Sequence, residues 1–156
     1  MAILYQNTTL LSIPSFRGLT PHIRLAISLN ASDEATRSRL MPVNCFHPLK
    51  KILEVCRKFP LQPRARITFE YVLLQGENDS PGDAKRLLKM LKGIPSKVNL
   101  IPLNEAPSIP FKKPSEERVK QFQDILMEGG LTSIVRTSKG ADISAACGQL
   151  QGKTPD

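Results

Sequence analysis

Apolar runs typical of buried strands alternate along this chain with segments of helical periodicity, and this alternation limits the possible folds more than any other feature. The clearest run, Arg66–Leu74, is rich in β-branched and aromatic residues. Similar runs occupy Ile23–Leu29, Val98–Leu103 and Thr132–Arg136. Because strands that alternate with helices form parallel sheets covered by those helices, the sequence predicts an α/β fold of about four parallel β/α units plus a short C-terminal helix.

Capping residues and prolines predict the bounds of the first two helices. Ser32 or Asp33 is expected to cap a helix that ends near Leu40, before Pro42. Pro48 suits the first turn of the next helix, which closes before residue 60. The apolar face of that helix is expected to consist of Leu49, Ile52, Leu53 and Cys56.

Two later helices carry similar signals. Ser80 with Asp83 three residues on resembles a capping box, and Gly93 is placed to end that helix. Ser115 is expected to open a helix that finishes at Gly129–Gly130 and has one apolar side: Val119, Phe122, Ile125 and Leu126. The proline-rich segment 102–114 between them is predicted to be a loop.

The first residues differ from the rest of the chain. Residues 1–17 are polar and irregular, so we expect a loosely attached N-terminal segment ahead of an α/β unit that occupies residues 18–156. The chain has no basic signal-peptide start and no run of about 18 apolar residues. The sequence therefore predicts a protein of the cytoplasm.

Charge and cysteine content narrow the class of partner. Lys and Arg number 22 against 14 Asp and Glu, a formal net charge of +8 that favours polyanions such as RNA. A basic, solvated surface without a specific partner explains the charge equally well.

The three cysteines, Cys45, Cys56 and Cys147, are too few and too scattered for a disulfide framework or a zinc or iron–sulfur motif, so we expect reduced thiols and no metal site. Cys56 fits a core position, and Cys45 has no predicted role.

Cys147 lies in the run Asp142–Leu150, close to the C-terminus. A thiol at such a position is either a small buried apolar group or a nucleophile. The neighbouring cations Arg136 and Lys139 would favour the thiolate, the form that acts as a nucleophile.

Six short runs together resemble a known family. They are Leu25–Leu29, Arg39–Asn44, Phe69–Leu74, Gly76–Asp79, Val98–Asn104 and Ala146–Leu150. In this order they are similar to the C-terminal half of the radical S-adenosylmethionine RNA methyltransferases of the RlmN/Cfr type, over about residues 18 to 150. The resemblance implies that residues 18–156 form the C-terminal half of a partial (β/α) radical-SAM barrel, while residues 1–17 have no counterpart.

The resemblance also implies an activity. Such enzymes methylate C2 of adenine in 23S rRNA and, for some members, tRNA. They use S-adenosyl-L-methionine, a 4Fe-4S cluster bound by a C-x-x-x-C-x-x-C motif, and an electron donor.

Site residues follow from the same resemblance. Cys147 matches the cysteine that carries the methyl group as S-methylcysteine. Ser28, Leu29 and Asn30 match a strand end that contacts S-adenosylmethionine, although the family usually has histidine where this chain has Asn30. Asn104 matches an asparagine that binds the same cofactor, and a loop asparagine bonded to nearby backbone is the alternative interpretation.

Basic residues flank the proline-rich loop and the segment before Cys147. They are Lys112, Lys113, Arg118, Arg136 and Lys139. We expect them to contact RNA phosphates through salt-dependent interactions, with a solvated basic face as the alternative.

The chain contains no C-x-x-x-C-x-x-C motif, so it has no ligand set for the cluster. We therefore predict a fragment of an rRNA (adenine-C2) methyltransferase that is inactive alone, with one side of its sheet unpaired. Two alternatives remain open. One is a basic RNA-binding remnant without catalysis, and the other is half of a two-chain enzyme completed by a separate N-terminal chain.

Overall fold

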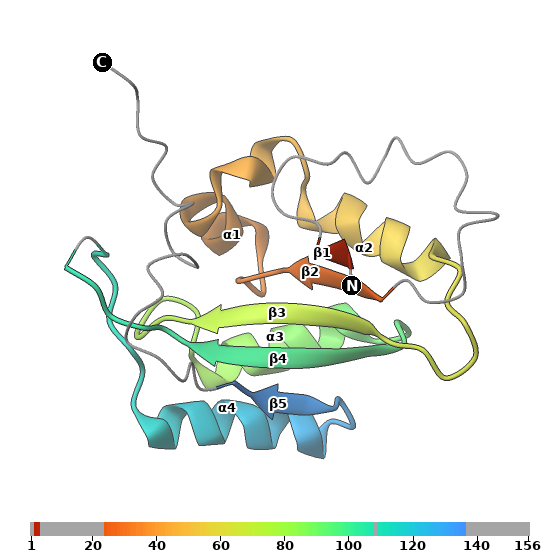
Figure 1. Cartoon of the computed structure of the whole chain (residues 1–156). Helices are drawn as coiled ribbons and strands as arrows, with labels where there is room; N and C mark the ends of the chain where they lie inside the picture. The colour runs from red at the N-terminus through yellow and green to blue at the C-terminus, as the bar shows by residue number, and fades with distance from the viewer. Residues whose placement is uncertain (1, 4–23, 108, 137–156) are drawn as a thin grey trace.

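A single parallel sheet organises the molecule (Figure 1). The computed structural model describes residues 2–3, 24–107 and 109–136. Five strands lie side by side in chain order and every neighbouring pair is parallel. They are β1 Ala2–Ile3, β2 Leu25–Ser28, β3 Ile67–Leu73, β4 Ser96–Pro102 and β5 Ser133–Val135. The predicted α/β class with parallel strands is confirmed.

Three helices cover one face of this sheet. They are α2 Leu49–Lys58, α3 Pro81–Leu91 and α4 Glu116–Glu128. In Figure 1, α3 lies behind β3 and β4, with α2 on one side of it and α4 on the other. Alternate residues of β3 point into this layer and are fully buried: Ile67, Phe69, Tyr71 and Leu73. The main core therefore lies between the sheet and these helices, as burial of one helix stripe and one sheet face requires.

The other residues of each strand line the opposite face. Ser28 of β2 pairs in register with Glu70 of β3, which pairs with Asn99 of β4. Among the described residues, no helix packs on the central part of this face. Strands in chain order with all their helices on one side form the wall of a barrel, whereas a doubly wound sheet has helices on both faces.

Local signals set the helix ends as expected. The Asp33 side chain accepts a hydrogen bond from the N–H of Thr36 (2.8 Å) and caps α1, Glu34–Leu40. A 3₁₀ helix, η2, follows at Pro42–Cys45. Ser80 and Asp83 form the predicted capping box of α3.

The later turns also follow the prediction. Ser115 caps α4 by accepting a hydrogen bond from the N–H of Arg118 (3.3 Å). Gly93 (φ 82°) and Gly130 (φ 80°) take left-handed conformations directly beyond α3 and α4, where glycine is the least strained residue.

The N-terminal residues add one feature that the sequence did not indicate. Ala2 pairs with Leu25, and Ile3 pairs with Ala26. The free side of β2 is therefore partly covered by a strand from the segment expected to be irregular. The predicted C-terminal helix with Cys147 lies outside the described residues. No helix in the described ranges combines the length and apolar character needed to cross a membrane.

Candidate functional site

Two of the predicted cofactor contacts lie at the carboxyl end of the sheet. Ser28 is the last residue of β2, and Asn104 follows the end of β4 by two residues. All strands run the same way, so both residues belong to the same end of the sheet, where α/β proteins bind their ligands. Both residues are exposed, and within the described part of the chain neither side chain makes a hydrogen bond. A hydroxyl and an amide are thus available to a ligand.

Asn30, a further expected contact, links the ends of β2 and β3 through hydrogen bonds. It has a left-handed backbone (φ 56°), which asparagine tolerates better than most residues. Its Oδ1 accepts a hydrogen bond from the N–H of Val72 (2.9 Å). This bond extends the pairing between β2 and β3 beyond the last strand residue. The N–H of Leu29 likewise donates to the carbonyl of Glu70 (2.8 Å), and the Leu29 side chain is fully buried.

Asn78 fixes the Gly76–Asp79 turn onto the same strand ends. Its side chain is completely buried and uses both functional groups of its amide. Nδ2 donates to the carbonyls of Asn30 (2.8 Å) and Val72 (2.7 Å). Oδ1 accepts from the N–H of Leu74 (2.8 Å). The sequence predicted the turn but not this cross-link, because its partner Asn30 lies 48 residues earlier.

The Arg37 side chain, from α1, holds the end of β2 in place through hydrogen bonds. Only 3% of it is exposed. One guanidinium nitrogen donates to the carbonyls of both Ser28 and Leu29, and Nε donates to Oδ1 of Asn44 (2.9 Å). Burial lowers the pKa of this guanidinium. Sequence reasoning did not single out Arg37; its spacing of three from the buried Leu40 was the available signal that it faces inward.

Asn44 joins Arg37 to Glu34. The Asn44 amide donates to Oε2 of Glu34 (2.8 Å). Although burial by itself raises the pKa of Glu34, hydrogen bonds from the Asn44 amide and from the N–H groups of Lys50 and Leu49 bring it below its ordinary value. The chain of contacts therefore runs from a carboxylate through an amide and a guanidinium to the Ser28–Leu29 backbone.

A small second core closes this end of the sheet. Leu40, Met41, Leu74 and Leu103 are buried together, with Val43, Val72, Ile109 and Phe111 packed against them. These residues come from α1, η2, the ends of β3 and β4, and the proline-rich loop. The loop is anchored by the N–H of Gln75, which donates to the carbonyl of Lys112 (2.9 Å). This bond attaches the loop to the end of β3, close in sequence to the buried Leu74.

The predicted RNA contacts lie near the same end. Lys112 and Lys113 are exposed on the proline-rich loop, and Arg118 is exposed in the first turn of α4. Arg136 follows β5, and its N–H donates to the carbonyl of Leu100 (2.8 Å). Lys139 and Cys147 lie outside the described residues, so their placement stays a prediction.

Comparison with known proteins identifies the family. No family model matches the chain. The dual-specificity RNA methyltransferase RlmN of Syntrophotalea carbinolica is 50% identical over 143 residues, which cover 90% of this chain and 38% of the relative. RlmN of Anaeromyxobacter sp. strain Fw109-5 is 54% identical over 141 residues, 88% of this chain and 37% of the relative.

Over this region the chain matches the C-terminal part of RlmN proteins. RlmN of Syntrophobacter fumaroxidans is 48% identical over 159 residues and extends the match to 96% of this chain and 45% of the relative. The chain spans less than half the length of the RlmN relatives named here. The predicted family is thus confirmed, and it is a family of methyltransferases.

Solved structures agree with the RlmN assignment. A radical SAM methyltransferase from Sphaerobacter thermophilus is 46% identical, with a TM-score of 0.75 over 81% of this chain and 37% of that chain. A domain of pyruvate-formate lyase-activating enzyme from Bacteroides vulgatus, 23% identical with a TM-score of 0.58, covers 72% of this chain and 66% of that chain, and shows the fold alone.

Radical SAM chemistry implies an iron–sulfur cluster, and the described residues do not fit one. Among them, no group of three His, Cys, Asp or Glu side chains is placed to hold a metal ion. Cys56 is buried in the main core, and burial raises the pKa of its thiol to about 11. Cys45 is exposed. The core placement predicted for Cys56 is confirmed.

Proposed function

We propose that this chain provides the S-adenosylmethionine-binding and methyl-carrying part of an RlmN-type RNA methyltransferase that works in the cytoplasm. The observation that carries the proposal is the pair of exposed polar groups, Ser28 and Asn104, at the carboxyl end of a sheet whose strand ends are tightly cross-linked. The identity of about 50% to RlmN proteins supports it.

The residues at this end fit S-adenosylmethionine in their chemistry. The cofactor supplies a methyl group on a sulfonium, and its ribose, adenine and amino acid groups need both donors and acceptors. The Ser28 hydroxyl and the Asn104 amide can each donate and accept. Leu29 and Asn30 would act differently, because their backbone and amide groups already bond to Glu70, Arg37, Val72 and Asn78. They would position Ser28 instead of gripping the ligand.

Cys147 is the proposed methyl carrier. Its thiolate would attack the methyl carbon of S-adenosylmethionine, forming a new sulfur–carbon bond while the sulfonium–carbon bond breaks. The products are S-methylcysteine and S-adenosylhomocysteine, and the thiol proton leaves to solvent before the attack.

Methylation of RNA would require more than this chain. The proposed substrate is adenine in 23S rRNA, with tRNA as a second candidate. The C-x-x-x-C-x-x-C ligands are not among the residues of this chain and would have to be supplied in addition to them, together with an electron donor. Purified chain mixed with S-adenosylmethionine, reductant and 23S rRNA should therefore incorporate no methyl groups into RNA. Incorporation without any added protein would contradict this proposal.

Calorimetric titration with S-adenosylmethionine tests the binding site directly. The chain should bind the cofactor, and Ser28→Ala or Asn104→Ala should each weaken binding about tenfold, the effect of one lost hydrogen bond. Gln62→Ala is the control, because Gln62 is exposed in the loop at the opposite end of the sheet. Equal affinity of all four proteins would remove Ser28 and Asn104 from the site.

A second function is favoured by the net charge of +8 and the exposed Lys112, Lys113, Arg118 and Arg136. The chain would then be an RNA-binding module without catalysis. Salt-dependent RNA binding together with no calorimetric signal for S-adenosylmethionine would establish that function in place of the first.

A further inference from the structure

Exposed cations gather at the amino end of the sheet, opposite Ser28 and Asn104. They stand directly before β2 and β3, at or just beyond the ends of α2 and α3, and in the loop between α2 and β3. We call this set the amino-end basic rim: Arg24, Arg57, Lys58, Arg64, Arg66 and Lys92. Helices that connect parallel strands run back toward the amino end, so their last turns meet the strand starts there. Residues far apart in the chain thus share one end of the molecule.

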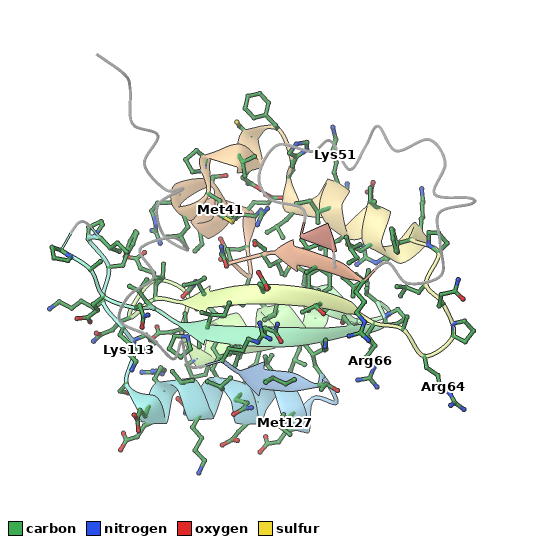
Figure 2. The ribbon with its side chains drawn as sticks, viewed as in Figure 1. Met41, Lys51, Arg64, Arg66, Lys113 and Met127 are labelled. Carbon is green, nitrogen blue, oxygen red and sulfur yellow. The ribbon has the colours of Figure 1, made fainter. Side chains whose placement is uncertain are left out.

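Two hydrogen bonds fix parts of this rim. Arg66 donates from its guanidinium to the Thr132 hydroxyl (2.6 Å), which links the start of β3 to the start of β5. Arg57 donates to the carbonyl of Met90 (3.4 Å) and ties the end of α2 to the end of α3. Figure 2 shows Arg64 and Arg66 projecting outward at one end of the sheet, while Lys113 lies at the other end.

Within the described ranges, no carboxylate forms an ion pair with the rim. The ion pairs within the described residues join Arg39 to Glu77, and Arg86 to Asp33 and Asp83. None of these residues belongs to the rim. Glu54 of α2 and Glu128 at the end of α4 form no ion pair with the rim. The positive charge of the rim is therefore not offset by ion pairs within the part of the chain that the structure describes.

Arg64 is an unusual residue for its backbone. Its φ is +66°, a left-handed conformation that glycine or asparagine adopts at lower cost. The turn closes with a hydrogen bond from the N–H of Ala65 to the carbonyl of Gln62 (2.9 Å). That hydrogen bond does not use the Arg64 side chain, which is exposed.

We propose that the amino-end basic rim binds the phosphate backbone of a folded RNA. Guanidinium groups match phosphate oxygens with two parallel hydrogen bonds, and Arg24, Arg57, Arg64 and Arg66 provide them from separate elements. The 59–66 loop, which carries Arg64 and Arg66, contains none of the exposed large apolar side chains of the described chain, Phe46, Met127 and Ile134. This loop therefore lacks the apolar insertion typical of a membrane-binding surface.

This surface is separate from the cations at the carboxyl end. The proposed contacts are to phosphates, so they would not recognise the base sequence of the RNA. Phosphate contacts set position and orientation, so the rim would hold one region of an RNA while another region reaches the far end of the sheet. The proposal needs neither cofactor binding nor methyl transfer. Its failure and the failure of the proposed methyl-carrying function are therefore distinguishable.

Fluorescence anisotropy of the purified chain with a labelled hairpin RNA, between about 50 and 200 mM salt, tests the rim. Arg64→Gly with Arg66→Gln should weaken binding and reduce the slope of log affinity against log salt by roughly two, about one for each lost phosphate contact. Arg64→Gly alone should reduce the slope by about one, and it relieves backbone strain, so its effect is not one of unfolding.

Two controls make the result decisive. Lys85→Gln with Lys120→Gln removes the same charge from exposed positions of α3 and α4 and should change the slope little. Arg64→Lys with Arg66→Lys preserves the charge and should keep most of the slope of log affinity against log salt. An equal loss in the Lys85 and Lys120 variant would overturn the proposal in favour of net charge alone. If Arg64→Gly with Arg66→Gln lost binding to phosphatidylserine vesicles but kept its affinity for RNA, the proposal would be overturned in favour of a membrane-binding surface.

Discussion

The buried amide of Asn78 donates a hydrogen bond to the main-chain carbonyl of Asn30, 48 residues earlier in the chain, over 2.8 Å. The same amide group bonds to Val72 and Leu74. One side chain therefore joins the turn after β3 to the ends of both β2 and β3. The candidate cofactor site depends on this cross-link, because Ser28 lies two residues from Asn30.

Replacing Asn78 with alanine should destabilise the fold strongly. The change leaves two buried carbonyls and one N–H without partners, which we expect to cost about 2–4 kcal/mol of unfolding free energy. Urea unfolding followed by circular dichroism measures it. Asn104→Ala is the matched control and should stay within about 0.5 kcal/mol, because Asn104 is exposed. Similar losses in both variants would contradict the cross-link.

Substitutions of Asn30 should separate backbone strain from hydrogen bonding. Asn30→Ala loses the bond to the N–H of Val72 and also places alanine at a φ of 56°, so about 2–3 kcal/mol of stability should be lost. Asn30→Gly loses only the bond and should cost about 1 kcal/mol. Equal unfolding midpoints for the two variants would show that the left-handed conformation does not matter.

Arg37 should matter far more than Arg39 on the same helix. Arg37→Met leaves the carbonyls of Ser28 and Leu29 unpaired and should cost about 2–3 kcal/mol. It should also weaken S-adenosylmethionine binding, because Ser28 loses its brace. Arg39→Met breaks an exposed ion pair with Glu77 and should cost at most about 1 kcal/mol. Thermal unfolding of both variants measures the difference in stability, and calorimetry measures the difference in S-adenosylmethionine affinity. An undiminished affinity for S-adenosylmethionine in Arg37→Met would refute the predicted role of Arg37.

The free energy of unfolding should fall in acid because the fold stabilises the charged forms of two carboxyl groups, Asp83 and Glu34. Burial opposes the effect at Asp83, but hydrogen bonds from Ser80, Ser32 and Arg86 hold its pKa below the ordinary value of 3.8, and the pKa of Glu34 is also lowered. A lowered folded-state pKa contributes stability above the unfolded pKa, and that stability disappears as pH falls through the folded pKa.

The unfolding free energy should therefore decline below about pH 4.5, the range where unfolded carboxyls take up protons first. Unfolding measured between about pH 3 and 7 should show a shallower decline in Asp83→Asn than in the unchanged chain. Asp124→Asn, at an exposed position of α4, should leave the decline unaltered. If Asp83→Asn showed the same pH dependence as the unchanged chain, Asp83 would be excluded as a cause of the loss of stability in acid.

The two described thiols should differ in reactivity. The pKa of Cys56 is raised to about 11 by burial, while Cys45 is exposed. Iodoacetamide at neutral pH should alkylate Cys45 and leave Cys56 unmodified until the chain is unfolded in urea. Mass spectrometry of tryptic peptides distinguishes them. Rapid labelling of Cys56 in the folded protein would mean that the helical layer opens readily.

Local signals predicted most of the fold. The caps at Asp33, Ser80 and Ser115 and the glycines at 93 and 130 act within a few residues of themselves, so the sequence shows them directly. The shared location of Ser28 and Asn104 followed from parallel strands. Pairing of Ala2–Ile3 with β2 did not, because a strand of two residues has no recognisable period.

The supports of the site were harder to predict than its exposed groups. Asn78, Arg37 and Asn44 have ordinary polar side chains in a turn, a helix and a 3₁₀ helix. Their roles come from partners that folding brings near, and periodicity carries no information on such pairs. Asn30 shows the same limit, because the family resemblance implied a ligand contact but gave no sign of its hydrogen bonds to Val72 and Asn78.

The order of the strands has a consequence for synthesis on the ribosome. Each strand from β2 onward pairs with the strand made before it, and the connecting helix packs on strands that already exist. Each newly emerged segment therefore finds its neighbour already available, and no described strand must wait for a later one to occupy a place between two earlier strands. Contacts between successive units keep loop closure short. A chain of this kind can assemble progressively from its first β/α unit to its last.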